Sequence, residues 1–113
     1  MQDKPDCNMG SVIYSETPEG INAKWIFKGT DEVQYGMGEA TRLSALNENH
    51  RFEGEFEIIY TDQNGHKSPR LNLVIAFVSD HYQLSWKMGD QLTDIGIGME
   101  HEGKLIASYK KAD

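Results

Sequence analysis

Aromatic side chains with polar tips are the residues of this sequence with the most scope for specific recognition. Buried tryptophan and tyrosine side chains need a hydrogen-bond partner for the indole N–H or the phenolic O–H. Several such tips inside one domain favour a pocket, and a plain packed core is a close alternative that the sequence leaves open. The residues expected to contact a small apolar or aromatic ligand are Trp25, Phe56, Tyr60, Tyr82, Trp86 and Tyr109, with Phe77 on the same inward surface.

Two carboxylates that each follow a Gly-x-Gly unit form a second set of candidates. Glu39 follows the unit at 36–38, and Glu100 follows the unit at 96–98. If they pointed into the domain, desolvation would raise their pKa values and suit them to general-base work in an isomerase- or cyclase-like pocket. A surface or turn role is favoured, so an enzyme remains an alternative hypothesis and no catalytic residue is predicted.

Other reactive residue types do not combine into a recognisable site. The four histidines, His50, His66, His81 and His101, lie outside short metal-ligand spacing of one another. Cys7 is the only cysteine, so an internal disulfide or a thiolate metal cluster cannot form. A nucleophile elbow of the Gly-x-Ser-x-Gly type does not occur in the sequence. We therefore predict no metal, no cofactor and no nucleophilic residue.

The elements that must position the aromatic residues are strands, because apolar residues recur with a period of two. In residues 21–27, for example, Ile21, Ala23, Trp25 and Phe27 alternate with mostly polar neighbours. Turn-like pairs such as Asn64-Gly65 separate the runs. The predicted strands are 11–17, 20–28, 32–40, 51–62, 69–79, 81–88, 91–101 and 104–111.

Regular spacing and short connections indicate an all-β fold, an antiparallel meander of about eight strands that closes into a small barrel. Residues 1–10 are expected to be a flexible N-terminal segment, and residues 11–113 a single β-barrel domain. Residues 39–50 depart from the strand pattern, with Ala40, Leu43 and Leu46 at threefold spacing, and predict one helical turn or a longer loop.

An internal repeat accompanies this pattern. Residues 23–40 and 84–101 both contain a tryptophan, a glycine turn with an aspartate, and Gly-x-Gly followed by glutamate. The natural interpretation is a duplicated four-strand unit. Glycines inside strands mark bends or close approach by bulky neighbours, which barrel closure needs.

The second half of the chain, YQLSWKMGDQLTDIGIGMEHEGKLIASY, resembles small uncharacterised bacterial proteins of the lipocalin- or avidin-like (calycin-type) class. The shared features are a tyrosine-led Leu-x-Trp strand, a glycine turn, a Gly-x-Gly strand and a closing Leu-x-x-x-Tyr strand. The resemblance covers about residues 70–109 and lacks the Gly-x-Trp opening typical of lipocalins. It implies a β-barrel and carries no established activity.

Apolar residues on nominally outer faces support a third hypothesis, a structural or homodimeric protein whose function lies on its surface. These residues are Ile26, Ile59, Val74, Ile95, Ile97 and Ile106.

The composition argues against several classes of partner. Eighteen acidic and eleven basic residues give a net charge of -7, which disfavours nucleic acid because phosphate binding needs clustered Lys and Arg. We predict no membrane insertion, because no apolar stretch approaches the length of a membrane helix. The sequence does not decide the compartment. The two alternatives are the cytoplasm and export, the latter with the signal peptide absent from this chain.

Overall fold

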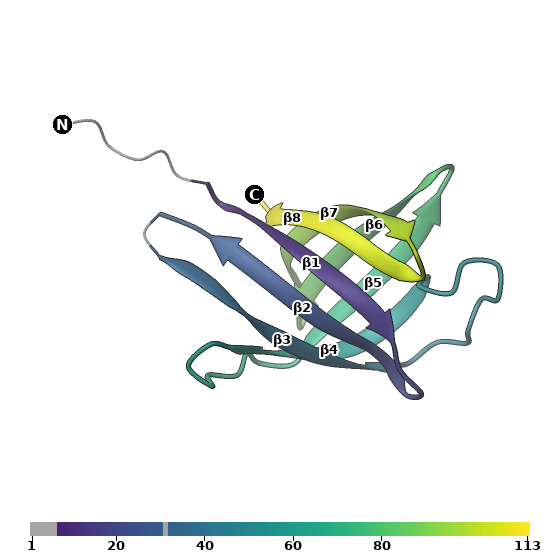
Figure 1. Cartoon of the computed structure of the whole chain (residues 1–113), viewed down its shortest axis with the longest axis horizontal. Coiled ribbons are helices and arrows are strands. Elements are labelled where there is room, and N and C mark those ends of the chain that lie inside the picture. The colour runs from purple at the N-terminus through teal and green to yellow at the C-terminus, as the bar shows by residue number, and fades with distance from the viewer. Residues whose placement is uncertain (1–6, 31) are drawn as a thin grey trace.

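In the part of the chain that the structure describes, eight antiparallel strands follow one another in chain order around a barrel (Figure 1). The computed structural model describes residues 7–30 and 32–113. Each strand pairs with the next, and β1 also pairs with β8, so the sheet closes into a barrel and the predicted fold is confirmed. The strands are β1 (Met9–Glu16), β2 (Gly20–Lys28), β3 (Val33–Arg42), β4 (Gly54–Asp62), β5 (Leu71–Val78), β6 (His81–Met88), β7 (Gln91–His101) and β8 (Lys104–Lys111).

The alternation in the sequence becomes an alternation between the barrel interior and solvent. On β2, Ile21 and Ala23 are buried, whereas Asn22 and Lys24 are exposed. Since a slip by one residue would turn every apolar side chain outward, this pattern fixes the register of the strands. The buried core comprises Val12, Tyr14, Ile21, Ala23, Ala40, Phe52, Phe56, Ile58, Leu73, Ile75, Tyr82, Leu84, Trp86, Leu105 and Ala107.

Tight turns join the strands of the second half. Between β7 and β8, Glu102 and Gly103 both have positive φ, 51° and 79°, as a two-residue type I′ hairpin turn requires. The predicted turn at Asn64-Gly65 lies within a longer connection, in which the Asp62 side chain accepts backbone N–H groups of Asn64 and His66 at 2.9 Å.

The two ends of the barrel differ. At one end, the connection between β3 and β4 loops across the opening, and Phe52 from this loop is 1% exposed (Figure 1). Arg42 fixes the loop by donating to the backbone carbonyls of Glu53 at 2.8 Å and Arg51 at 2.6 Å. Residues 43–50 of the predicted segment 39–50 are therefore part of a loop, the second of the two predicted forms, whereas residues 39–42 belong to β3. Strand β4 begins at Gly54 rather than at residue 51.

The N-terminal boundary differs from the prediction. Met9 and Gly10 pair with β2 and β8, so the barrel begins two residues before the predicted boundary at residue 11. Residues 1–6 of the predicted flexible segment lie outside the described residues. Among the described residues, no helix is long and apolar enough to cross a membrane.

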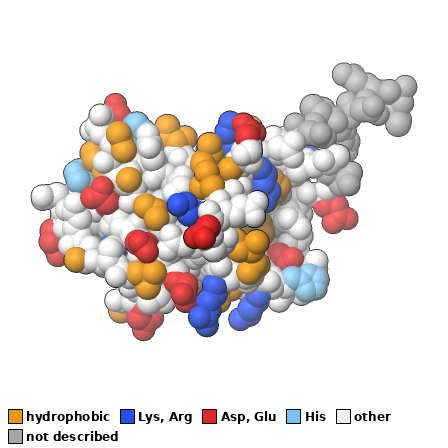
Figure 2. Space-filling model, turned by 180° about the vertical axis from the view of Figure 1, so that it is seen from behind, with side chains coloured by type: hydrophobic (Ala, Val, Ile, Leu, Met, Phe, Trp, Pro, Cys, Tyr) orange, Lys and Arg blue, Asp and Glu red, His pale blue; other side chains and the backbone are white. Residues whose placement is uncertain are grey.

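The surface mixes charged and apolar side chains. On the face seen in Figure 2, Lys, Arg, Asp and Glu side chains are interspersed with small apolar groups. Of the apolar residues predicted on outer faces, Ile26, Ile95 and Ile97 are 49%, 38% and 57% exposed. The other three, Ile59, Val74 and Ile106, are half-buried.

Candidate ligand-binding site

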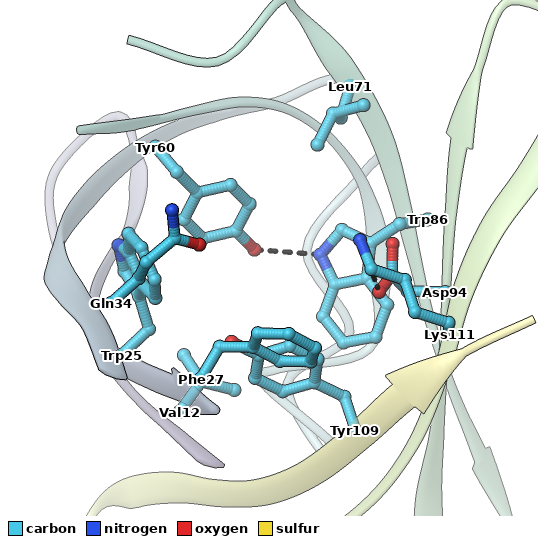
Figure 3. Close-up of a pocket in the computed structure, with 10 residues that line it drawn as sticks. All are labelled: Val12, Trp25, Phe27, Gln34, Tyr60, Leu71, Trp86, Asp94, Tyr109 and Lys111. Carbon is cyan, nitrogen blue, oxygen red and sulfur yellow. Dashed lines mark hydrogen bonds and ion pairs between the residues drawn. The ribbon is translucent and has the colours of Figure 1, made fainter. Parts of the chain in front are cut away.

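The interior of the barrel is divided into a packed half and an open half. The packed half lies under the Phe52 loop, where Phe56, Leu73 and Ile75 are almost completely buried. The open half contains a cavity of about 290 Å³ (Figure 3). Its lining consists of Val12, Trp25, Phe27, Gln34, Tyr60, Leu71, Trp86, Asp94, Tyr109 and Lys111.

Aromatic rings from four strands form most of the cavity wall. Trp25 and Phe27 come from β2, Tyr60 from β4, Trp86 from β6 and Tyr109 from β8. The Trp25 and Tyr60 rings meet edge to face with centroids 6.2 Å apart, and Tyr109 stacks on Phe27 at 5.9 Å. Trp86 lies 5.5 Å from Tyr109 at a tilt of 50°, so these rings line the space without closing it.

Glycines on neighbouring strands make room for the rings. A Cβ atom on Gly38 would lie 2.8 Å from the Tyr60 ring, and one on Gly10 would overlap the Tyr109 ring. Gly38 thus acts as one of the predicted sites of close approach, and Gly10 is a further site that was not predicted. The sequence repeat does not carry through to the pairing, however, because Trp25 faces Gly36 whereas Trp86 faces Asp94.

A hydrogen-bonded cluster occupies the floor of the cavity. The Trp86 indole nitrogen and the Tyr14 hydroxyl each lie 2.7 Å from the Tyr60 hydroxyl, as Figure 3 shows for the Trp86 bond. Burial raises the pKa values of Tyr14 and Tyr60 above the ordinary value of 10.0. Both phenols therefore keep their protons at neutral pH.

The remaining polar tips of the wall are bound to the backbone. Trp25 donates its indole N–H to the carbonyl of Met37 at 3.0 Å, and Tyr109 donates to the carbonyl of Ile26 at 3.2 Å. These bonds fix the ring orientations from behind the wall.

One ion pair stands at the cavity. The Lys111 ammonium lies 3.8 Å from the Asp94 carboxylate and 5.4 Å from the centroid of the Phe27 ring. The Asp94 side chain is only 15% exposed, whereas that of Lys111 is 66% exposed. The carboxylate therefore belongs to the cavity wall, and the ammonium reaches it from the solvent side.

Comparison of the chain with protein-family models, with curated proteins and with solved structures found no match. The function is accordingly argued from the geometry of the site.

The structure brings four of the six predicted ligand-binding residues to this cavity, namely Trp25, Tyr60, Trp86 and Tyr109. The other two lie in the packed half of the barrel. Phe56 is fully buried beneath the Arg42 guanidinium, which lies 4.6 Å from the ring centroid. Tyr82 packs against Phe52 and Phe77 and donates its hydroxyl proton to Glu100. Phe77, predicted on the same inward surface, is stacked on His50 at 3.9 Å.

The other six residues that line the cavity were not among the predicted contacts, namely Val12, Phe27, Gln34, Leu71, Asp94 and Lys111. Phe27 alternates in phase with Trp25, so the period of two could have identified it. Asp94 and Lys111 carry no such signal, because a charged residue on an inward face departs from the apolar pattern. Only the pairing of Asp94 with Trp86 and with Lys111 shows where it lies.

The two glutamates of the enzyme hypothesis lie on opposite faces of the sheet. Glu39 pairs with Asn22 and Ile59, out of phase with inward Gly38 and Ala40, and is exposed. Glu100 is in phase with Gly98 but lies six residues along β7 from Asp94, about 20 Å at the usual rise per residue. The expectation that the repeat makes them equivalent is wrong, and neither reaches the cavity. Among the described residues, no group of three His, Cys, Asp or Glu side chains could hold a metal ion.

Proposed function

We propose that this barrel is a binding module for a small, flat, apolar or aromatic ligand. The observation that carries the proposal is the convergence of Trp25, Tyr60, Trp86 and Tyr109 on one open cavity. Ligand sites are typically apolar, concave and furnished with a few polar groups, and their volumes begin near 300 Å³. The cavity is at the lower end of that range, which favours a ligand of one or two rings.

The rigidity of the wall supports the same proposal. Because backbone carbonyls hold Trp25 and Tyr109 from behind, little side-chain entropy would be lost when a ligand enters. Aromatic faces prefer offset or edge-to-face neighbours, and a flat ring between Trp25 and Trp86 would find both. A β-barrel is also what the calycin-type resemblance implies, and that relationship forms part of the proposal.

Native mass spectrometry of the purified protein, beside a denatured control, is the direct test. We expect a small-molecule mass that is lost on denaturation or, for protein purified without ligand, adducts with added aromatic compounds. Both tryptophans of the chain line the cavity, so binding should also change the intrinsic fluorescence.

A cavity-filling variant makes this test specific. Leu71→Trp adds bulk to the wall of the cavity and should abolish the adduct. Val78→Trp introduces the same side chain at an exposed position on the outer face of β5 and should leave binding intact. Equal binding by both variants would show that the ligand sits elsewhere.

Homodimer formation is a second candidate, favoured by one row of outer apolar residues. Met99, Ile106 and Ile13 pair directly across β7, β8 and β1, and Met99 and Ile13 are 63% and 39% exposed. Contiguous exposed apolar groups of this kind mark interfaces, and the continuous row would suit the same row of a second copy. Sedimentation velocity over a range of concentrations tests it. A dimer that Ile13→Lys dissociates and Val78→Lys does not would support the proposal, and a monomer at all concentrations would contradict it.

A further inference from the structure

The cluster on the cavity floor holds one more proton than its hydrogen bonds use. Tyr14, Tyr60 and Trp86 carry one polar hydrogen each, and the indole N–H can only donate. Two hydrogen bonds join them, one from Trp86 to Tyr60 and one between the two hydroxyls. Two bonds consume two protons, so one of the phenolic protons has no acceptor inside the cluster.

Burial decides which proton this is. The Tyr14 side chain is 0% exposed, and no hydrogen bond among the described residues takes its proton elsewhere than to Tyr60. If Tyr60 were the donor, the Tyr14 proton would be sealed in the core without a partner, which is costly. Tyr14 therefore donates, and Tyr60 accepts from both Tyr14 and Trp86. The unused proton belongs to Tyr60, which is part of the cavity wall.

We propose that the cavity selects flat aromatic ligands that carry an acceptor oxygen, such as a carbonyl group, placed to receive the Tyr60 proton. This inference rests on the proposed function and names its ligand class. Two donors converging on the Tyr60 oxygen polarise its O–H bond, because chains of hydrogen bonds strengthen one another. A ligand without an acceptor would displace the solvent that otherwise pairs with this proton and would leave it unpaired.

An amine ligand is the competing class, because aromatic walls and a carboxylate also suit a cation. The structure disfavours it at this site. The Asp94 carboxylate already has Lys111 at 3.8 Å, and that ammonium also lies near the face of Phe27. An incoming cation would have to compete with a charge that the chain itself supplies, whereas no hydrogen bond within residues 7–30 and 32–113 takes up the Tyr60 proton.

Matched probes of two ring sizes test the inference by calorimetry or tryptophan fluorescence. They are toluene with benzaldehyde, and indane with indan-1-one and 1-aminoindane. We expect the carbonyl compound of at least one size to bind about tenfold more tightly than its hydrocarbon, the loss for one unpaired donor. Binding of hydrocarbon and carbonyl compound with equal affinity would overturn the inference and leave the binding module intact. Preference for the amine, abolished in Asp94→Asn, would overturn it as well. Failure of every probe to bind would count against the binding module itself.

Two variants and one infrared spectrum test whether the Tyr60 hydroxyl causes the preference for the carbonyl compound. Tyr60→Phe should remove the preference for the carbonyl, whereas Tyr14→Phe, which deletes a hydroxyl of the same cluster, should retain it because the Tyr60 proton stays in place. Circular dichroism shows whether each variant is folded. The wild-type protein supplies a readout without mutation, the infrared carbonyl stretch of bound indan-1-one. A shift to lower frequency than in an apolar solvent is expected, and an unshifted band would overturn the assignment.

Discussion

Removal of single oxygen atoms from the Tyr14–Tyr60–Trp86 cluster should give strongly unequal losses of stability. In Tyr14→Phe, Tyr60 loses one donor but still accepts from Trp86, so no buried group is left unpaired. The expected decrease in the free energy of unfolding is about 1 kcal/mol, the net value of one hydrogen bond. In Tyr60→Phe, the Tyr14 O–H and the Trp86 N–H both lose their acceptor. At about 1–3 kcal/mol for each unsatisfied buried donor, the expected loss is about 2–6 kcal/mol.

The double variant provides the decisive comparison. Once Tyr60 is phenylalanine, the Tyr14 hydroxyl is a buried donor without a partner, so its removal should raise stability by about 1 kcal/mol or more. The same Tyr14→Phe change lowers stability in the wild-type protein, so the sign of its effect reverses between backgrounds. Additivity is the usual result for independent sites, which makes the reversal a specific signature.

Chemical denaturation followed by far-ultraviolet circular dichroism measures all four proteins on one scale. Tyr35→Phe is a matched control, because Tyr35 is 53% exposed on the outer face and the same change there should cost little. If Tyr14→Phe lowers the free energy of unfolding equally in both backgrounds, the two hydroxyls do not depend on one another and the proton count is wrong.

Three further predictions concern the frame around the site. Gly36→Ala should destabilise the barrel by about 1–3 kcal/mol or more in denaturation experiments, because its Cβ would overlap the backbone oxygen of Thr61. Gly29→Ala, whose nearest neighbour would lie at 3.5 Å, is the control that should cost little. Phe52→Ala should cost about 3–5 kcal/mol yet leave ligand affinity unchanged under conditions where the variant is folded, since Phe52 fills the packed end. The Glu53 carboxylate accepts the backbone N–H of Phe77 and the amide of Asn47, which lowers its pKa below 4.5. Its stabilisation is therefore complete above its ordinary pKa and is lost as the pH falls through the lowered value. Glu53→Gln should show a shallower loss of stability in an acid titration, and an identical titration would contradict that role.

The fold could be predicted from the sequence because the alternation of apolar and polar residues along a strand shows which residues face inward. On β2 the alternation of Ile21, Ala23 and Trp25 fixes one inward face, and Glu102-Gly103 marks a turn that permits only one hairpin geometry. Strand ends were less accurate, since they depend on partners distant in sequence. Met9 lies in β1 because Lys28 and Lys110 flank it, and nothing near residue 9 carries that information.

The site was only partly predictable, because a period of two gives the face of a residue but not its height in the barrel. Phe56 and Tyr60 lie on the same face of β4, yet four residues separate them by about 13 Å along the strand. One therefore falls in the packed half and the other at the cavity. The height of each side chain follows from the register between strands, including the shift after Trp86 that places Asp94 opposite it.

The uneven distribution of polar tips along the barrel axis bears directly on function. The packed end is built mainly from Phe52, Phe56 and Leu73, which need no hydrogen-bond partner, and the hydroxyl of Tyr82 there donates to Glu100. If the open end served stability alone, apolar side chains in place of Tyr14, Tyr60 and Trp86 would fill the space without a proton to satisfy. Replacing every partner of a buried hydrogen bond by apolar groups of similar shape is often nearly neutral, so a stability requirement gives little reason to retain the cluster. A ligand acceptor that uses the Tyr60 proton supplies such a reason, and it also explains why the cluster lies at the open end.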